Sequence, residues 1–200
     1  ITPNKALLEY ASKASGKAVH LIQADENASY EKEFKLDISA FLKMVSKPGA
    51  PHDTIEVEEI LGARIDSAFI GSCTNGRYED LAIAAEILKG RKVAPGVVLK
   101  IVPATDEIWL ECLKNGLVEI FKNAGALLSN AGCAGCAAGQ VGQNGAGEIT
   151  ISTGNRNFPG KQGKGEVFLA SPEVVAASAV AGFITTRDKI PTDSEINATN

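Results

Sequence analysis

An alternation of short apolar segments with helical segments, running from residue 64 to residue 182, constrains the fold more than any other feature. The apolar segments have the length of strands, and glycines mark helix ends between them, whereas Thr105 is expected to cap one helix and Ser171-Pro172 to start the last one. Strands that alternate with helices of about ten residues predict an α/β fold with a mainly parallel sheet and helices on both faces, a three-layer αβα arrangement. The predicted strands cover residues 64–70, 97–103, 126–129, 148–153 and 166–171, and the predicted helices cover residues 77–89, 105–115, 117–125 and 171–182.

The N-terminal third of the chain shows a weaker pattern. The dipeptide Thr2-Pro3 predicts the cap and the first residue of a helix that continues to Ser15. Two short strands are expected, over residues 17–22 and around residues 34–38, where apolar and charged residues alternate. The segment 47–54 holds two prolines and a glycine, so we predict a turn-rich connection and a candidate domain boundary there.

The composition is that of a globular protein and argues against two classes of partner. The apolar fraction of 44% and the charged fraction of 22% are ordinary for such proteins. The net charge is −4 and the lysines are spread among acidic residues, so no basic stripe indicates binding to nucleic acid. The longest apolar run, residues 174–184, is too short to span a bilayer, so we expect no membrane association.

The start of the chain and its few cysteines bear on its origin. The chain begins at Ile1 rather than Met, so we expect a piece of a longer protein or a processed chain. We expect no secretory signal before the first predicted helix, and the sequence contains only four cysteines. We therefore expect a reducing, cytoplasmic location, where a C-x-x-C pair is more often a metal or redox motif than a structural disulfide.

A glycine-rich stretch with two cysteines interrupts the alternation. Ten of the twenty glycines lie between Gly132 and Gly165, which indicates backbone held in loops. Loops at the carboxyl ends of parallel strands are where α/β proteins bind ligands. Cys133 and Cys136 stand three residues apart in this stretch, which favours a site over a flexible surface loop.

Two further cysteines lie outside the glycine-rich stretch. Cys73 follows a predicted strand and precedes a predicted helix, whose N-terminal amides favour a thiolate ligand. Cys112 lies within a predicted helix and is interpreted as a small buried apolar residue.

The three loop thiols, Cys73, Cys133 and Cys136, leave open a disulfide pair, part of a zinc site, or part of an iron–sulfur site. Structural zinc takes four ligands, and neither His20 nor His52 has a paired spacing to complete that set. A cubane cluster held by three cysteines would leave one iron open to act as a Lewis acid.

The segment 152–165 contains an arginine between two asparagines, again just past a predicted strand. Arg156 in such a loop suits bidentate recognition of a carboxylate, and Asn155 and Asn157 would add neutral hydrogen bonds. Lys161 would add a second positive charge. The alternative is a solvated turn whose asparagines satisfy only the backbone, and the segment alone does not decide between the two.

These segments together resemble the aconitase superfamily. The motifs GSCTNGR around Cys73, NAGCAGC around Cys133 and Cys136, and STGNRNF around Arg156 occur in the order that the family has. The stretch LASPEVVAASAVAGFI that follows them is also similar to the family. Within the superfamily, IGSCTNGRYEDLAIAAEILKGRKV is most similar to the large subunits of 3-isopropylmalate dehydratase and of its relatives, homoaconitase and 2,3-dimethylmalate dehydratase.

The resemblance implies a fold, a cofactor and a reaction. The fold would be that of the aconitase iron–sulfur domain, and the three loop cysteines would hold a [4Fe-4S] cluster whose fourth iron binds the hydroxyl and a carboxylate of the substrate. A hydro-lyase of this kind, with a role in leucine biosynthesis, would dehydrate and rehydrate a hydroxy di- or tricarboxylic acid. Asn155 and Arg156 would contact a substrate carboxylate. Lys161 stands where the family has a second arginine, so it keeps the charge and loses the planar fork.

The resemblance also implies missing parts. In the family, other substrate ligands and proton-transfer groups precede the first of these motifs, and the proposed catalytic serine lies in a separate swivelling domain or small subunit. Residues 1–62 would be the tail of a preceding domain plus a connecting segment, residues 63–186 the cluster-bearing domain, and residues 187–200 a loose tail. We expect no catalytic residue in this segment and no dehydratase turnover by the chain alone. A binding or assembly module with the same fold, or a thiol–disulfide protein that uses Cys133 and Cys136, are the alternative functions.

Overall fold

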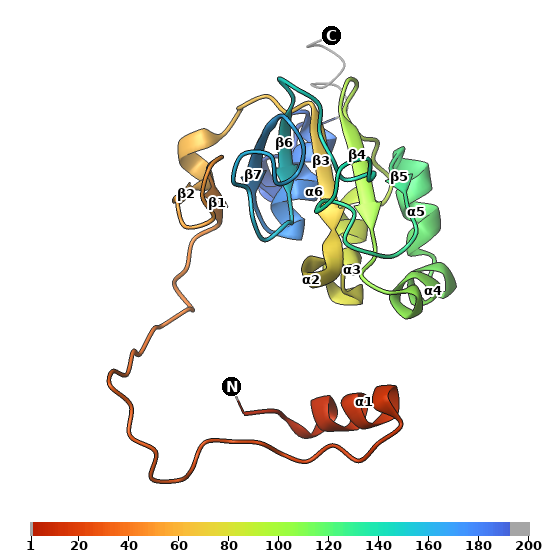
Figure 1. Cartoon of the computed structure of the whole chain (residues 1–200). Coiled ribbons are helices and arrows are strands. Elements are labelled where there is room, and N and C mark those ends of the chain that lie inside the picture. The colour runs from red at the N-terminus through yellow and green to blue at the C-terminus, as the bar shows by residue number, and fades with distance from the viewer. Residues whose placement is uncertain (1, 193–200) are drawn as a thin grey trace. The chain divides into compact units, whose positions relative to one another are not determined.

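The chain forms two compact units in the computed structural model, which describes residues 2–192 (Figure 1). The first unit ends at Phe41 and the second begins at Leu42. The first unit contains the helix α1 (Lys5–Ser15), and the side-chain oxygen of Asn4 caps it by accepting a hydrogen bond of 2.8 Å from the Leu7 amide. No residue of α1 is buried.

The second unit is built on a seven-stranded sheet in the order β2-β1-β7-β6-β3-β4-β5 (Figure 1). The strands from β7 to β5 pair in parallel, and β1 and β2 form an antiparallel hairpin that joins the sheet through β7. The α/β class and the mainly parallel sheet are therefore confirmed. The strands are β1 (Met44–Ser46), β2 (Thr54–Glu56), β3 (Ser67–Gly71), β4 (Val98–Val102), β5 (Leu127–Leu128), β6 (Ile149–Ser152) and β7 (Glu166–Leu169).

Four helices of the second unit pack on one another and share a main apolar core with one face of the sheet. The predicted N-caps at Thr105 and Ser171 are confirmed, because each side-chain oxygen accepts a hydrogen bond from a backbone amide in the first turn of its helix. These helices are α3 (Tyr78–Leu88), α4 (Asp106–Lys114), α5 (Leu117–Ala124) and α6 (Pro172–Ala181), and the short elements are α2 (Ser72–Asn75), η1 (Val57–Ile60) and η2 (Arg187–Lys189).

The opposite face of the sheet is covered by loops. Successive residues of a strand point to opposite faces, so Ala68 and Ile70 of β3 belong to the main core while Phe69 packs with Val102 and Ala134 on the other side. Ala134 belongs to the connection from β5 to β6, here called the cysteine loop (residues 129–148). The connection from β6 to β7 is here called the arginine loop (residues 153–165).

The order of the strands explains why helices and loops lie on different faces. The chain passes from β3 to β4 to β5 in one direction, and then returns beyond β3 to β6 and β7. Crossovers between parallel strands are almost always right-handed, so the outward and returning connections lie on opposite faces. The direction reverses between β3 and β6, and such a switch point is where α/β sheets form ligand-binding crevices at the carboxyl ends of their strands.

Three predictions for the first unit are wrong. The helix is capped by Asn4 rather than Thr2, although it ends at Ser15 as expected. Residues 17–22 and 34–38 form no strand. The side chains of Phe34, Leu36 and Ile38 are 73%, 75% and 74% exposed. An alternating pattern forms a strand only where a neighbouring strand accepts its backbone hydrogen bonds, and the described residues of the first unit offer no such neighbour.

Residues 42–62 lie between the start of the second unit and the predicted domain start at residue 63, and they contribute two strands to the sheet. The predicted turn at 47–54 joins β1 to β2, and Val45 and Val57 are fully buried in the main core. At the other end, Lys189 Nζ in η2 lies 2.9 Å from Glu58 Oε1. Residues 193–200 of the predicted loose tail lie outside the described residues, and the origin of residues 1–62 in a preceding domain stays a prediction.

Candidate functional site

Cys73 lies in the one-turn helix α2, directly after β3, rather than in the loop before a helix. The backbone is tightly constrained there, because a Cβ at Gly71 would lie 2.0 Å from the Val102 carbonyl oxygen. Ser72 follows with a φ of +91°, which non-glycine residues rarely adopt. Thr153 Oγ1 accepts a hydrogen bond of 2.8 Å from Gly71 N, and Asn75 Nδ2 donates to the Thr153 carbonyl. The segment with Cys73 is thereby fixed to the carboxyl end of β6.

Cys133 and Cys136 flank a buried turn of the cysteine loop. Ala134 packs on Phe69 and Val102, and the Gly142 amide donates a 3.0 Å hydrogen bond to the Ala134 carbonyl. A Cβ at Gly142 would lie 2.7 Å from the Phe69 ring, so only glycine allows this close approach. The loop therefore presses its apolar residue into the sheet and leaves Cys136 exposed and Cys133 partly exposed.

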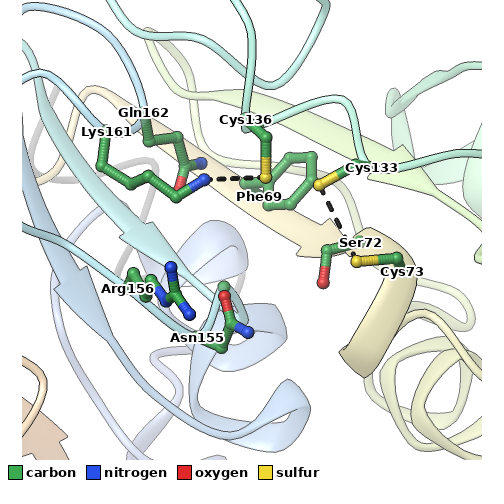
Figure 2. A pocket seen from close by; sticks show the side chains of 11 residues that line it. Phe69, Ser72, Cys73, Cys133, Cys136, Asn155, Arg156, Lys161 and Gln162 are labelled. Atoms are coloured by element: carbon green, nitrogen blue, oxygen red, sulfur yellow. Dashed lines mark hydrogen bonds between the residues drawn. The ribbon is translucent and has the colours of Figure 1, made fainter.

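The three loop thiols make two different contacts (Figure 2). The Sγ atoms of Cys73 and Cys133 lie 3.9 Å apart, although the two residues are 60 positions apart in the chain. Cys136 Sγ instead lies 2.7 Å from Lys161 Nζ, so the predicted cation of the arginine loop touches the cysteine loop. All three cysteines are free thiols. Cys133 thus meets Cys73 rather than its C-x-x-C partner.

The arginine loop divides its three predicted polar residues between two directions. Asn155 and Arg156 are exposed and line a pocket. Asn157 is only 4% exposed and its Nδ2 donates to the carbonyls of Lys47 and Val167, at 2.6 and 3.0 Å. The prediction that Asn157 flanks the ligand is therefore wrong, because its side-chain amide turns to the sheet and donates to two backbone carbonyls there. Asn157 anchors the loop to the sheet instead.

One pocket contains all six predicted site residues, namely Cys73, Cys133, Cys136, Asn155, Arg156 and Lys161. Figure 2 shows the thiols of α2 and the cysteine loop on one side and Asn155 with Arg156 across from them. The remaining lining comes from Phe69, Ser72, Gly135, Gly154 and Gln162, so no histidine, aspartate or glutamate lines the described pocket. The pocket lies at the carboxyl ends of the parallel strands β3 and β6. At this point the connections between strands change direction across the sheet.

Two residues of the site were missed by the sequence analysis. Phe69 lies in β3 between Ala68 and Ile70, and the alternation of faces along the strand is the one signal that could have placed it away from the main core. Gln162 is 4% exposed and forms hydrogen bonds with Ser152 of β6 and with Gly142 of the cysteine loop. Nothing in the sequence distinguishes Gln162 from a polar loop residue.

The donor set fits an iron–sulfur cluster. The described residues hold no group of three or more His, Cys, Asp or Glu side chains that converges on one metal ion. In a cluster the thiolates bind different irons, so they need to surround a volume rather than meet at a point. Three accessible thiols line one pocket without a competing carboxylate or imidazole, so the types of ligand present are those of such a cluster.

The fourth thiol differs from these three. Cys112 in α4 is 2% exposed and packs in the main core, as interpreted from the sequence. Burial, with a smaller contribution from the charge of Glu111, raises its pKa to about 11. A thiol that stays protonated at neutral pH is a poor nucleophile and a poor metal ligand.

Comparison with known proteins identifies the family of the chain. Residues 58–182 match the aconitase family (aconitate hydratase). The chain belongs to the aconitase family. Proteins of this family carry a [4Fe-4S] cluster, and the matched residues include the three loop cysteines and Arg156.

The similar curated proteins are large subunits of one enzyme. The chain is 44% identical over 187 residues to 3-isopropylmalate dehydratase large subunit 1 of Methanopyrus kandleri and 45% identical over 194 residues to large subunit 1 of Archaeoglobus fulgidus. It is 43% identical over 195 residues to the large subunit of a Hydrogenobaculum species. These alignments cover 92%, 95% and 96% of this chain but only 45%, 46% and 46% of the relatives. The chain thus spans slightly less than half the length of the curated relatives it matches.

No helix among the described residues is both long and apolar enough to cross a membrane.

Proposed function

We propose that the chain is the cluster-bearing part of the large subunit of a [4Fe-4S] hydro-lyase resembling 3-isopropylmalate dehydratase. The observation that carries the proposal is the pocket in which three free thiols face Asn155 and Arg156, in a chain of the aconitase family. The reaction would be isomerisation of a hydroxy di- or tricarboxylic acid by dehydration and rehydration, as part of leucine biosynthesis. The protein would act in the cytoplasm, where reducing conditions keep thiols free.

The residues of the chain would bind and orient the substrate. Arg156 is exposed at the pocket and offers the planar fork that holds a carboxylate with two parallel hydrogen bonds. Asn155 would donate to the same carboxylate from the neighbouring position. Lys161 would add a single positive charge beside the cluster ligand Cys136, 2.7 Å away, and so attract a second carboxylate without fixing its plane.

Cys73, Cys133 and Cys136 would hold the cluster. A [4Fe-4S] cluster on three thiolates supplies a Lewis-acidic iron with an open position, which polarises a substrate hydroxyl and carboxylate. Phe69, which lines the pocket, packs against Ala134 on the side of the sheet.

We propose that proton transfer uses groups from outside this chain. The described pocket is lined by three thiols, Arg156 and Lys161 as its ionisable groups, and no carboxylate or imidazole lies among them. Dehydration needs a base for a carbon-bound proton and an acid for the departing hydroxyl. We therefore propose that the rest of the large subunit and a small swivelling subunit or domain complete the site, and that this chain alone has no turnover.

The first unit is the part of the chain we propose to dock on the rest of the large subunit. Its strand-like segments expose large apolar side chains, among them Ile22, Phe34, Leu36 and Ile38. Relatives matched over nearly all of this chain are about twice as long, so a further half of the protein is the natural partner of that surface.

The test is anaerobic reconstitution of the chain with ferrous iron and sulfide. We expect about four irons and four sulfides per chain, and mild oxidation should then release the open iron and give the EPR signal of a three-iron cluster. Zinc, or no metal, taken up in place of iron under these conditions would contradict the proposal.

The same samples test the alternative functions. A thiol–disulfide protein would give a disulfide with a measurable reduction potential that cycles in glutathione buffers. A binding module without the chemistry would bind its partner subunit equally well with and without iron. Iron uptake that depends on the loop thiols, together with dehydratase activity restored by the remaining parts of the enzyme, separates the proposed function from both.

A further inference from the structure

Two loops that lie on the same face of the sheet carry the two halves of the pocket. The cysteine loop brings Cys133 and Cys136, and the arginine loop brings Asn155 and Arg156. Each loop is rich in glycine, so neither has much conformational preference of its own. The distance between thiols and guanidinium therefore depends on whatever joins the loops to each other.

Gln162 is the buried side chain that joins them at the pocket, in addition to the exposed contact of Lys161 Nζ with Cys136 Sγ. Its Oε1 accepts a 2.9 Å hydrogen bond from Ser152 Oγ at the end of β6, and its Nε2 donates a 3.0 Å hydrogen bond to the Gly142 carbonyl in the cysteine loop. Gly142 in turn donates to the carbonyl of Ala134, the residue after Cys133. A continuous path of hydrogen bonds thus runs from β6 through Gln162 to the position beside Cys133.

Packing strengthens the same connection. A Cβ built at Gly135 would lie 3.5 Å from the Cγ and Cδ atoms of Gln162, so the amide side chain lies directly against the turn between the two cysteines. Gln162 is only 4% exposed and both of its bonds are buried. Buried amide hydrogen bonds with both ends satisfied fix a geometry strongly, because leaving either partner unpaired is costly.

A second buried connection between the loops lies outside the pocket lining. Asn144 receives hydrogen bonds from the arginine loop at Lys164 N and Gly165 N, and its own amide donates to the Gln162 carbonyl. Asn144 does not line the pocket, whereas Gln162 does. The two buried connections therefore have different roles. Asn144 holds the two loops together outside the pocket, and Gln162 sets their relative position at the pocket.

We propose that Gln162 is a positioning residue that holds the cluster-binding turn Cys133–Cys136 in register with the carboxylate-binding residues Asn155 and Arg156. The proposal rests on the proposed function in treating these groups as one site. It assigns Gln162 no contact with the substrate. Its role is to transmit the position of one loop to the other.

The test compares Gln162→Met with Gln143→Met in the full chain. Methionine matches the length of glutamine and removes both hydrogen bonds. Gln143 is the matched control, because its amide also supports the cysteine turn, donating 2.8 Å to the Gly135 carbonyl, but it reaches neither β6 nor the arginine loop. Backbone hydrogen exchange followed by mass spectrometry reports both loops without requiring metal.

We expect Gln162→Met to raise exchange about tenfold in both loops, the effect of losing buried hydrogen bonds worth about 1.4 kcal/mol. Gln143→Met should raise it in the cysteine loop alone. After reconstitution, Gln162→Met should lose iron to a chelator about tenfold faster than wild type and shift the EPR signal of the three-iron form. Exchange confined to one loop in Gln162→Met, or exchange indistinguishable from Gln143→Met, overturns the proposal.

A second variant guards against misfolding. If Gln162→Met lowers the helix content of the chain, Gln162→Asn takes its place, because it keeps an amide that is too short to reach both Ser152 and Gly142. The same two-loop exchange pattern supports the proposal, and a one-loop pattern overturns it. Wild-type chain that takes up no iron while the exchange pattern holds contradicts the proposed function and leaves the positioning role supported.

Discussion

On the helix-covered face of the sheet, Ile70 and Ile151 are fully buried in the main core. On the loop-covered face, their neighbours in sequence behave differently, with Phe69 packing on the cysteine loop and Ser152 bonding Gln162 of the arginine loop. Each fully buried isoleucine contributes about 1.5–3 kcal/mol by burial. A polar side chain such as Ser152 contributes about 1 kcal/mol net through its hydrogen bond.

One sheet thus supports both the stability of the second unit and the candidate site. The helix face supplies most of the apolar burial, so the loop face is free to hold glycines at positive φ and polar side chains in a defined network. The two kinds of cysteine follow the same division, with Cys112 on the helix face and the three pocket thiols on the loop side.

Replacing a thiol on the loop side should abolish cluster assembly, whereas replacing the thiol on the helix face should not. Cys133→Ser leaves too few thiolates, and a serine hydroxyl is a poor ligand for iron in a cluster. Cys112→Ser is the control, since Cys112 lies in the main core. Iron and acid-labile sulfide counts after anaerobic reconstitution measure both. A full complement of iron in Cys133→Ser would rule out the ligand assignment.

Neighbouring residues of β6 should separate stability from site geometry. Ile151→Ala should lower the free energy of unfolding by about 2–5 kcal/mol, because it opens a cavity in the main core. Ser152→Ala should lower it by only about 1–3 kcal/mol, but should speed iron loss because the bond to Gln162 is gone. Denaturant titration and chelator kinetics measure the two effects. The contrast between the faces fails if Ser152→Ala destabilises the chain more than Ile151→Ala.

Two glycines of the cysteine loop should respond differently to an added methyl group. At Gly142 the Cβ would meet the Phe69 ring at 2.7 Å, so Gly142→Ala should cost about 1–3 kcal/mol through overpacking. At Gly135 the nearest atom lies at 3.5 Å, an ordinary contact, so Gly135→Ala should change stability by less than about 0.5 kcal/mol. Thermal melts of the two variants give the comparison, and equal melting temperatures would show that the loop does not press on the sheet as described.

The pKa of Cys112 predicts a small loss of stability at alkaline pH. Burial raises this pKa from 9.0 to about 11, so between these values the unfolded chain has released the proton that the folded chain keeps. The unfolded state binds fewer protons there, and the free energy of unfolding falls as pH rises from 9 to 11, by about 1–2 kcal/mol from this group.

The buried Lys100 acts in the opposite sense, and a matched variant separates the two. Burial lowers the pKa of Lys100 below 10.5, so its contribution to stability rises with pH over that range. Subtracting the unfolding free energy of Cys112→Ala from that of the wild type at each pH isolates the thiol. A difference that does not decrease between pH 9 and 11 would contradict burial as the cause of the raised pKa.

Local pattern was sufficient for most of the second unit. The predicted strands from residue 64 onward, the caps at Thr105 and Ser171, and the turn at 47–54 are all found in the structure. The same reasoning failed for residues 17–22 and 34–38, which alternate like strands and form none. Alternation indicates which side chains could share a face. A strand also needs a neighbouring strand for its backbone hydrogen bonds, and only the tertiary structure supplies that neighbour.

The residues of the candidate site could likewise be predicted from the sequence, but their arrangement in space could not. The sequence by itself determined that three loop cysteines, Asn155, Arg156 and Lys161 are the chemically capable side chains, because motif and residue type are local properties. Only the tertiary structure brought Cys73 within 3.9 Å of Cys133, set Lys161 against Cys136 and turned Asn157 into the sheet. It also revealed Gln162 as the link between loops. These contacts depend on the order in which parallel strands lie side by side, and strand order is fixed by burial and backbone pairing across the whole sheet rather than by any single segment.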